Sequence, residues 1–273
     1  MQPGGKIVTI STCFGDVSAT RVTIVGEDRG RTGSVSEAVP CHHLGTLAPA
    51  NKRRGLLALA INFGGPFVFG VLGFKIHAGH FVERHGLIII IALGESIVAI
   101  GVGASEVGLG AGVILASLLG VAVAASLWWA YFDYVVLLAE RRLSGARGHE
   151  RARLARDSYS YLHLPMLAGI VFVALGVKKT LAHIGDPLGT IPAVALCGGV
   201  ALYLLGHNAF RLRDAGSVSV LRLVVAALSC ALIPLGTQAP AILTLGTLAA
   251  LLVAFVAAET LYWREDRGKL RTH

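Results

Sequence analysis

The sequence predicts an all-α fold, a polytopic bundle of about seven transmembrane helices. The 273-residue chain is 54% hydrophobic with a mean hydropathy of +0.69. Only 15% of its residues are charged, whereas soluble domains carry about 25%. From residue 55 onward, apolar stretches follow one another, each about long enough to cross a hydrocarbon core of ~30 Å.

The chain divides into three predicted parts. Residues 1–54 hold no stretch long enough to span a membrane, so we expect a poorly ordered N-terminal head. Residues 55–264 form the predicted helix bundle, and residues 265–273 form a basic tail. The four cysteines form no CxxC pair and the glycines form no nucleotide-binding pattern, so we expect no disulfide, no metal site and no cofactor.

Seven apolar segments are expected in order along the bundle. They cover residues 55–76, 86–104, 109–138, 158–177, 189–209, 219–236 and 239–262. The third is longer than a bilayer requires, which allows a tilted helix or one that emerges from the membrane. Only a few residues around Pro240 separate the last two, which should form a tight helical hairpin.

The loop charges predict a multi-pass protein of the cell inner membrane with a cytoplasmic C-terminus. Six arginines lie within residues 141–156, and we count Arg211, Arg213 and Arg222 as loop charges on the same side. The cluster at residues 52–54 precedes the first span on the opposite side and does not fit. Because topology explains the net charge of +8, we expect membrane lipids and not nucleic acid as partners; the oligomeric state is not indicated.

Three acidic residues lie within the predicted spans, namely Glu95, Asp133 and Glu259. A charged side chain at the membrane centre costs about 2.5–3.5 kcal/mol on insertion scales, so it usually faces a partner or a water-filled cavity. Glu95 lies about nine residues, or ~13 Å, inside its span. It should be protonated or paired with a cation from another helix. Two interpretations of Glu95 stay open, a proton or cation relay and a neutral acid that hydrogen-bonds a neighbouring helix.

Aromatic residues accompany the other two acids. Asp133 follows Trp128 and Trp129, and Glu259 is followed by Tyr262. Tryptophan and tyrosine gather at membrane interfaces. We therefore predict that Asp133 and Glu259 lie at helix ends and help to anchor them.

His163 and Pro165 lie inside the fourth segment. Proline removes a backbone hydrogen bond, so a kink is expected there. His163 could hydrogen-bond Glu95 or line a pathway with it, or it could be a neutral histidine satisfied by packing.

The densest polar group in the chain combines His77, His80, Glu83 and Arg84. On a helix these side chains would approach one metal ion only loosely. We expect instead a juxtamembrane segment in which Glu83 and Arg84 pair with residues of other loops.

Three stretches resemble the bacterial low-temperature-requirement A family of membrane proteins. They are HFVERHGLIIIIALGESIVAIG at 80–101, DSYSYLHLPMLAGIVFVALG at 157–176 and YLLGHNAFRLR at 203–213. The resemblance runs from about Leu56 to the C-terminus and implies a multi-helix inner-membrane protein, in a family whose molecular activity is not established as a whole. It also ranks Glu83, Arg84 and Glu95 as site candidates. Family members typically begin with further helices that include a segment like ELFFDLVFVF, so the head is expected to be unrelated and the chain a truncated form.

We expect a transporter or channel-like protein that moves a proton, an ion or a small solute past Glu95, with Glu83, Arg84 and His163 as further candidates. The alternative is a non-transporting scaffold or stress-related sensor whose polar residues serve helix packing. An enzyme is not expected, because the spans hold no Ser/His, paired-Asp or HExxH arrangement.

Overall fold

The computed structural model describes residues 77–262, apart from 109 and 134–140. The predicted head, the first predicted span at 55–76 and the basic tail lie outside the described residues. Within the described part, six helices are long and apolar enough to cross a membrane. This confirms the predicted fold class.

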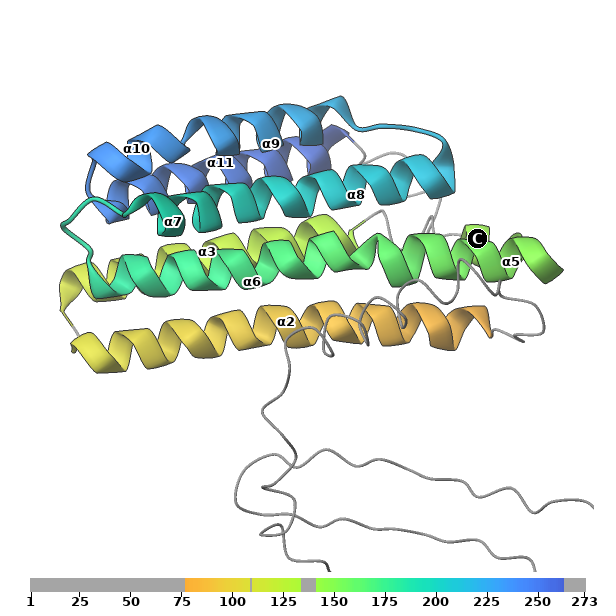
Figure 1. Ribbon diagram of the computed structural model, residues 1–273, viewed down its shortest axis with the longest axis horizontal. Helices are drawn as coiled ribbons and strands as arrows, with labels where there is room; N and C mark the ends of the chain where they lie inside the picture. Colours follow the sequence, from red (N-terminus) through yellow and green to blue (C-terminus); the bar gives the residue numbers. More distant parts are fainter. Residues whose placement is uncertain (1–76, 109, 134–140, 263–273) are drawn as a thin grey trace, which may run out of the picture. The chain divides into compact units, whose positions relative to one another are not determined.

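The helices run back and forth along a common direction (Figure 1). The first two spans are α2 (Ala78–Val107) and α3 (Ala111–Phe132). The third joins α5 (Gly148–Leu154), the π-helix η2 (Ala155–Tyr161) and α6 (His163–Ala182). The fourth joins α7 (Thr190–Ala193), the π-helix η3 (Val194–Gly198) and α8 (Gly199–Ala215). The last two are α9 (Val220–Ala231) with α10 (Ile233–Gln238), and α11 (Ala241–Tyr262).

The α6 helix is central and contacts α2, α3, α8 and α11. Its closest neighbour is α8, because glycines let the two backbones approach. A Cβ atom on Gly169 would lie 2.6 Å from the carbonyl oxygen of Gly199, and one on Gly176 would lie 2.5 Å from the Leu196 Cβ atom. No side chain fits at either glycine. Small residues serve this purpose in membrane bundles, where apolar surface alone does not drive helices together.

The α2 helix lies at one edge of the described bundle and packs mainly on α6 and α3 (Figure 1). Its buried residues recur at alternating steps of four and three, the spacing of left-handed helix packing. They are Val82, Gly86, Ile89, Leu93, Ser96, Ile100 and Gly103, and Ala104 next to Gly103 is buried as well. The opposite face of α2 is exposed and mainly apolar, as lipid contact requires.

Near Pro165, where we expect a kink, the structure has a π-helical segment, η2, immediately before α6. Proline has no N–H to donate to the carbonyl four residues earlier. In η2 the chain uses wider bonds instead, and the Leu162 N–H donates to the Asp157 carbonyl at 3.1 Å. This change of helical pitch sets the directions of the side chains in η2, which contribute to the polar network described next.

The hairpin predicted between the last two spans is present. Only Ala239 and Pro240 separate α10 from α11. The loop before α7 holds this turn, because the Ala241 N–H donates to the Asp186 carbonyl at 2.9 Å and the Leu188 N–H to the Gly236 carbonyl at 2.8 Å.

Candidate functional site: a buried polar network

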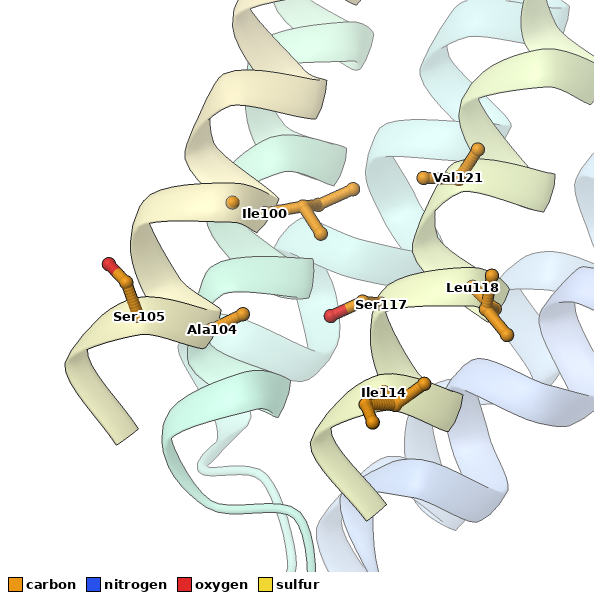
Figure 2. A pocket seen from close by; sticks show the side chains of 8 residues that line it. Ile100, Ala104, Ser105, Ile114, Ser117, Leu118 and Val121 are labelled. Carbon is orange, nitrogen blue, oxygen red and sulfur yellow. The ribbon is translucent and has the colours of Figure 1, made fainter. Parts of the chain in front are cut away.

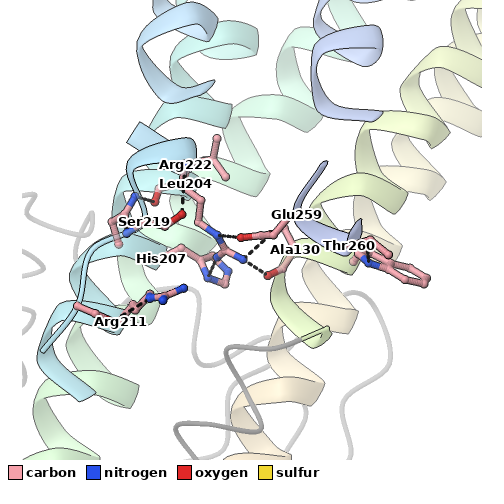
Figure 3. A network of polar contacts seen from close by, with 11 residues as sticks. Ala130, Leu204, His207, Arg211, Ser219, Arg222, Glu259 and Thr260 are labelled. Atoms are coloured by element: carbon pink, nitrogen blue, oxygen red, sulfur yellow. Dashed lines mark hydrogen bonds and ion pairs between the residues drawn. The ribbon is translucent and has the colours of Figure 1, made fainter. Parts of the chain in front are cut away.

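The most buried charged groups of the described bundle are Arg222 of α9 and Glu259 of α11, which form an ion pair. Arg222 is 1% exposed and Glu259 is 5% exposed. The guanidinium donates from Nε to Oε1 and from Nη2 to Oε2, both at 2.9 Å, and Nη2 also donates to the Ala130 carbonyl at 3.0 Å (Figure 3). The two-pronged geometry is the strong form of an arginine–carboxylate contact.

His207 of α8 completes this centre. Its Nδ1 atom lies 2.7 Å from Nη1 of Arg222. A guanidinium only donates hydrogen bonds, so Nδ1 is the acceptor and the ring proton is on Nε2. The Nε2 atom is buried and has no hydrogen-bond partner among the described residues. His207 therefore keeps one buried donor free beside a buried charge pair.

Local structure explains why Arg222 points inward. Ser219 is the N-cap of α9 and accepts a hydrogen bond from the Arg222 N–H at 3.5 Å. The Ser219 N–H in turn donates to the Asn208 side chain at 2.9 Å, which ties the start of α9 to α8. These bonds determine the rotation of the first turn of α9 and direct Arg222 between α8, α11 and α3.

A second set of polar side chains lies beside this centre. The Tyr131 hydroxyl is 2.8 Å from Nε2 of His163, and Nδ1 of His163 is 3.1 Å from the Ser158 carbonyl. Because a carbonyl only accepts, His163 carries its proton on Nδ1 and accepts the Tyr131 hydroxyl at Nε2. The Ser158 hydroxyl donates to Oδ1 of Asp214 at 2.8 Å. We call Asp214, Ser158, His163 and Tyr131 the polar string.

The polar string meets the ion pair through ring contacts. The rings of Tyr131 and His207 lie edge to face with 5.6 Å between centroids. At the outer side of the string, the half-buried His85 contacts the rings of His163 and Tyr159 at 5.2 and 5.3 Å. His85 donates from Nδ1 to the Phe81 carbonyl at 2.8 Å, which leaves Nε2 as its acceptor atom. Titratable side chains thus follow one another from a half-buried position to the buried charge pair.

The structure separates the four residues predicted as site candidates. His163 is buried in the polar string, whereas Glu95 is exposed on the outer face of α2. Glu95 makes no hydrogen bond or ion pair with any described residue, so a bond from His163 to Glu95, one of the two alternatives left open by the sequence, is not found. His163 is satisfied by Tyr131 and Ser158 instead.

Glu83 and Arg84 are both exposed. Glu83 lies 3.4 Å from His80 within the same helix. Neither residue pairs with another loop in the part of the chain that the structure describes. Their expected loop pairing is therefore not found among these residues.

Both residues of the ion pair lie deeper than we expect from the sequence. The sequence indicates a loop charge at Arg222 and an interfacial residue at Glu259, whereas both side chains are buried. Both lie within a few residues of a helix end, and spacing alone does not say whether such a side chain faces the lipid or the core. The signal that could have found them is that one cation and one carboxylate fall inside apolar segments 219–236 and 239–262, which form a hairpin.

Within the described residues, no group of three or more His, Cys, Asp or Glu side chains could hold a metal ion. The side chains of the polar network are also not arranged as metal ligands, because other groups already occupy them. Its histidines bond to Arg222, Tyr131 and a backbone carbonyl, and its carboxylate Glu259 bonds to a guanidinium. Chemically, this arrangement can hold a charge pair, and it can exchange protons within two hydrogen-bonded pairs, Tyr131 with His163 and Ser158 with Asp214.

The fold and this network define a class, that of polytopic helical membrane proteins with a buried charged centre. A sequence model of one protein family, the bacterial low temperature requirement A protein (LtrA), matches residues 34–257. The chain belongs to this family. The match begins at residue 34, earlier than the expected start near Leu56, so part of the head lies within the family region.

One curated relative is an uncharacterized protein of Rhizobium meliloti (strain 1021), which is 31% identical over 162 residues. The aligned region covers 55% of this chain and 39% of the relative. The chain thus spans about two fifths of the length of this relative. No solved structure matches the chain.

Proposed function

We propose that the protein is a transporter or channel-like protein of the cell inner membrane that moves protons, with Glu259 as its intramembrane carboxylate and its C-terminus in the cytoplasm. The observation that carries the proposal is the buried Arg222–Glu259 pair with the unpartnered Nε2 atom of His207 beside it. Ionisable residues inside membrane helices commonly mark ion pathways and proton relays.

The polar string supplies a route to this centre. Protons enter at His85, whose ring lies 5.2 Å from the ring of His163; His163 shares a hydrogen bond with Tyr131, and the ring of Tyr131 lies 5.6 Å from the ring of His207. The two ring contacts hold no hydrogen bond, so a water molecule or a side-chain rotation must complete each of these two steps. Each of these groups can donate and accept a proton, and histidine and tyrosine relay protons when they lie within hydrogen-bond reach. The π-helix η2, which carries Ser158, also fits this role, because such segments are frequent at functional sites.

Proton flux into liposomes tests the proposal. Purified protein is reconstituted with a pH-sensitive dye inside, a pH gradient is imposed, and valinomycin with potassium holds the membrane potential. Native protein should acidify the interior faster than empty liposomes, and Glu259→Gln should lower the rate roughly tenfold or more, because the carboxylate can no longer release a proton. Glu83→Gln is the control, since this exposed carboxylate lies outside the network. Native protein that conducts no faster than empty liposomes contradicts the proposal.

A second candidate function is that of a non-transporting scaffold or sensor whose polar residues hold helices together. It is favoured by the four hydrogen bonds of Arg222, whose guanidinium contacts α3, α8 and α11 at once. In that case Glu259→Gln lowers the amount of folded protein recovered from membranes, and the folded fraction behaves like native protein in every flux assay. Enzymatic activity is part of neither proposal.

A further inference from the structure

We propose that the outer face of α2 is a docking surface for another transmembrane helix, one that carries a basic side chain opposite Glu95. The surface follows steps of four and three along α2, which keep residues on one face in left-handed helix packing. Its residues are all exposed, and we call them the outer seam: Leu87, Ile91, Gly94, Val98, Gly101 and Ser105. The outer seam has the same spacing as the buried seam through which α2 packs on α6 and α3.

The glycines of the outer seam indicate a helix partner and not lipid. Gly94 and Gly101 are seven residues apart, and a Cβ atom at either would meet nothing within 4 Å. The same protein uses this spacing where two helices touch. Gly169 and Gly176 of α6 are also seven residues apart, and added Cβ atoms there would collide with α8 or η3. Lipid chains need no glycine, whereas a helix backbone approaches closely only where side chains are small.

Glu95 identifies the chemistry of the partner. It directly follows Gly94, and it lies twelve residues, or about 18 Å, before Val107, the last residue of α2. Apolar side chains surround it on the seam, and no described residue forms an ion pair or hydrogen bond with it. A second copy of α2 in parallel would place Glu95 against Glu95, where like charges repel. A basic side chain complements the carboxylate, so a helix with a central lysine or arginine fits best.

A groove adjoins the outer seam between α2 and α3 (Figure 2). It has a volume of about 390 Å³ and is lined by Gly101 and Ser105 together with apolar residues of both helices. Ser117 points into it from α3, and its Oγ atom is buried without a hydrogen-bond partner among the described residues. The groove gives a docked helix room for its side chains and offers a hydroxyl for one of them.

Binding of designed transmembrane peptides tests this inference. The probe is a leucine-based transmembrane peptide with one central lysine and alanines along its contact face, and the matched peptide has leucine in place of the lysine. Energy transfer from labelled protein to labelled peptide is measured in liposomes of native chain and variants. The native chain should bind the lysine peptide about tenfold more tightly than the leucine peptide.

Three variants separate the parts of the surface. Glu95→Gln should abolish the preference for lysine, because the charge is lost. The double variant Gly94→Leu/Gly101→Leu should weaken the binding of both peptides, and the open space at both glycines lets the bundle fold unchanged, as a melting curve verifies. Ile97→Leu, exposed on α2 outside the outer seam, should bind like the native chain. Equal binding of both peptides by the native chain, or native binding by the double glycine variant, overturns the proposal.

Discussion

Arg222 contacts three helices at once, and this explains why one residue organises the polar end of the bundle. Its guanidinium bonds to Glu259 of α11, His207 of α8 and the Ala130 carbonyl of α3. Removing water from two charges is costly, and a buried pair persists only when its remaining donors and acceptors are satisfied. Here the additional bonds of Arg222 satisfy this condition.

Replacing one member of the pair should therefore lower the free energy of unfolding more than replacing both members. Arg222→Met leaves the Glu259 carboxylate buried and unpaired, and we expect a loss of about 3–5 kcal/mol in the free energy of unfolding. In the double variant Arg222→Met/Glu259→Leu neither charge remains, so much of this loss should be recovered. Denaturant unfolding followed by tryptophan fluorescence measures both. The single variant Glu259→Leu completes the comparison. If the losses of Arg222→Met and Glu259→Leu add up in the double variant, the two residues are not coupled.

The hydrogen-bond partners of the two buried histidines predict opposite tautomers. His163 donates from Nδ1 to the Ser158 carbonyl, so its proton is on Nδ1. His207 accepts from Arg222 at Nδ1, so its proton is on Nε2. Solid-state nitrogen NMR of histidine-labelled protein should show one ring of each kind, assigned with His163→Gln and His207→Gln. The same tautomer at both positions contradicts this account of the network.

At the scale of the helices, glycine position decides which faces pack inside the bundle. Gly176 of α6 lies against Leu196, and an added Cβ atom would be 2.5 Å from the Leu196 Cβ atom. Gly94 of α2 is also helical but has open space around it. The two glycines differ in surroundings and not in local conformation.

Alanine substitution separates the two cases. Gly176→Ala should destabilise the bundle by about 1–3 kcal/mol or more, because α6 and η3 must move apart. Gly94→Ala should leave stability unchanged or raise it slightly, since alanine favours the helix over glycine. The melting temperatures of the two variants provide the comparison. If Gly94→Ala is as unstable as Gly176→Ala, packing against other helices does not explain the effect of these substitutions on stability.

The sequence predicts which segments are helices better than how each helix is rotated. Five of the predicted apolar segments correspond closely to helices of the structure, and the predicted segment 109–138 corresponds to α3 and continues past its described end. The helices extend further than the apolar runs at several ends, because charged residues such as those of α5 continue a helix outside the hydrocarbon core. Rotation is hard to predict for α3 and α11, because apolar residues lie on every side of both helices.

The candidate site shows the same limit. His163 could be singled out because it is a histidine inside an apolar segment next to a proline, and it lies in the network. Glu95 could be singled out in the same way, yet it faces outward, because position along a helix does not reveal its direction. Arg222 and Glu259 could not be paired from spacing, since the contact joins residues 37 apart in the chain through tertiary packing.

Across the whole described bundle, the charged residues gather at one end. The starts of α2 and α6 and the ends of α8 and α11 meet there, together with the arginines of α5 and its neighbours (Figure 1). At the opposite end, Lys178 and Lys179 are the only lysine or arginine residues that the described chain carries. The asymmetry predicts that the polar end faces the cytoplasm.

Reporter fusions test this orientation. Alkaline phosphatase fused after the C-terminus should be inactive, because it stays in the cytoplasm, and green fluorescent protein fused there should fluoresce. A phosphatase fusion at Gly185, in the exposed loop between α6 and α7, should be active. The reverse pattern would place the arginine-rich end outside and contradict the topology.

Proton conduction through His163 and Tyr131 to the buried charge pair is tested most directly by Tyr131→Phe. This change removes one hydroxyl, the hydrogen-bond partner of His163, and keeps the ring. Tyr203→Phe is the matched control, because its buried hydroxyl donates to the Leu127 carbonyl outside the string. In proton-flux measurements on folded protein in liposomes, Tyr131→Phe should lower the rate roughly tenfold or more while Tyr203→Phe keeps the native rate. A native rate in Tyr131→Phe would contradict this route.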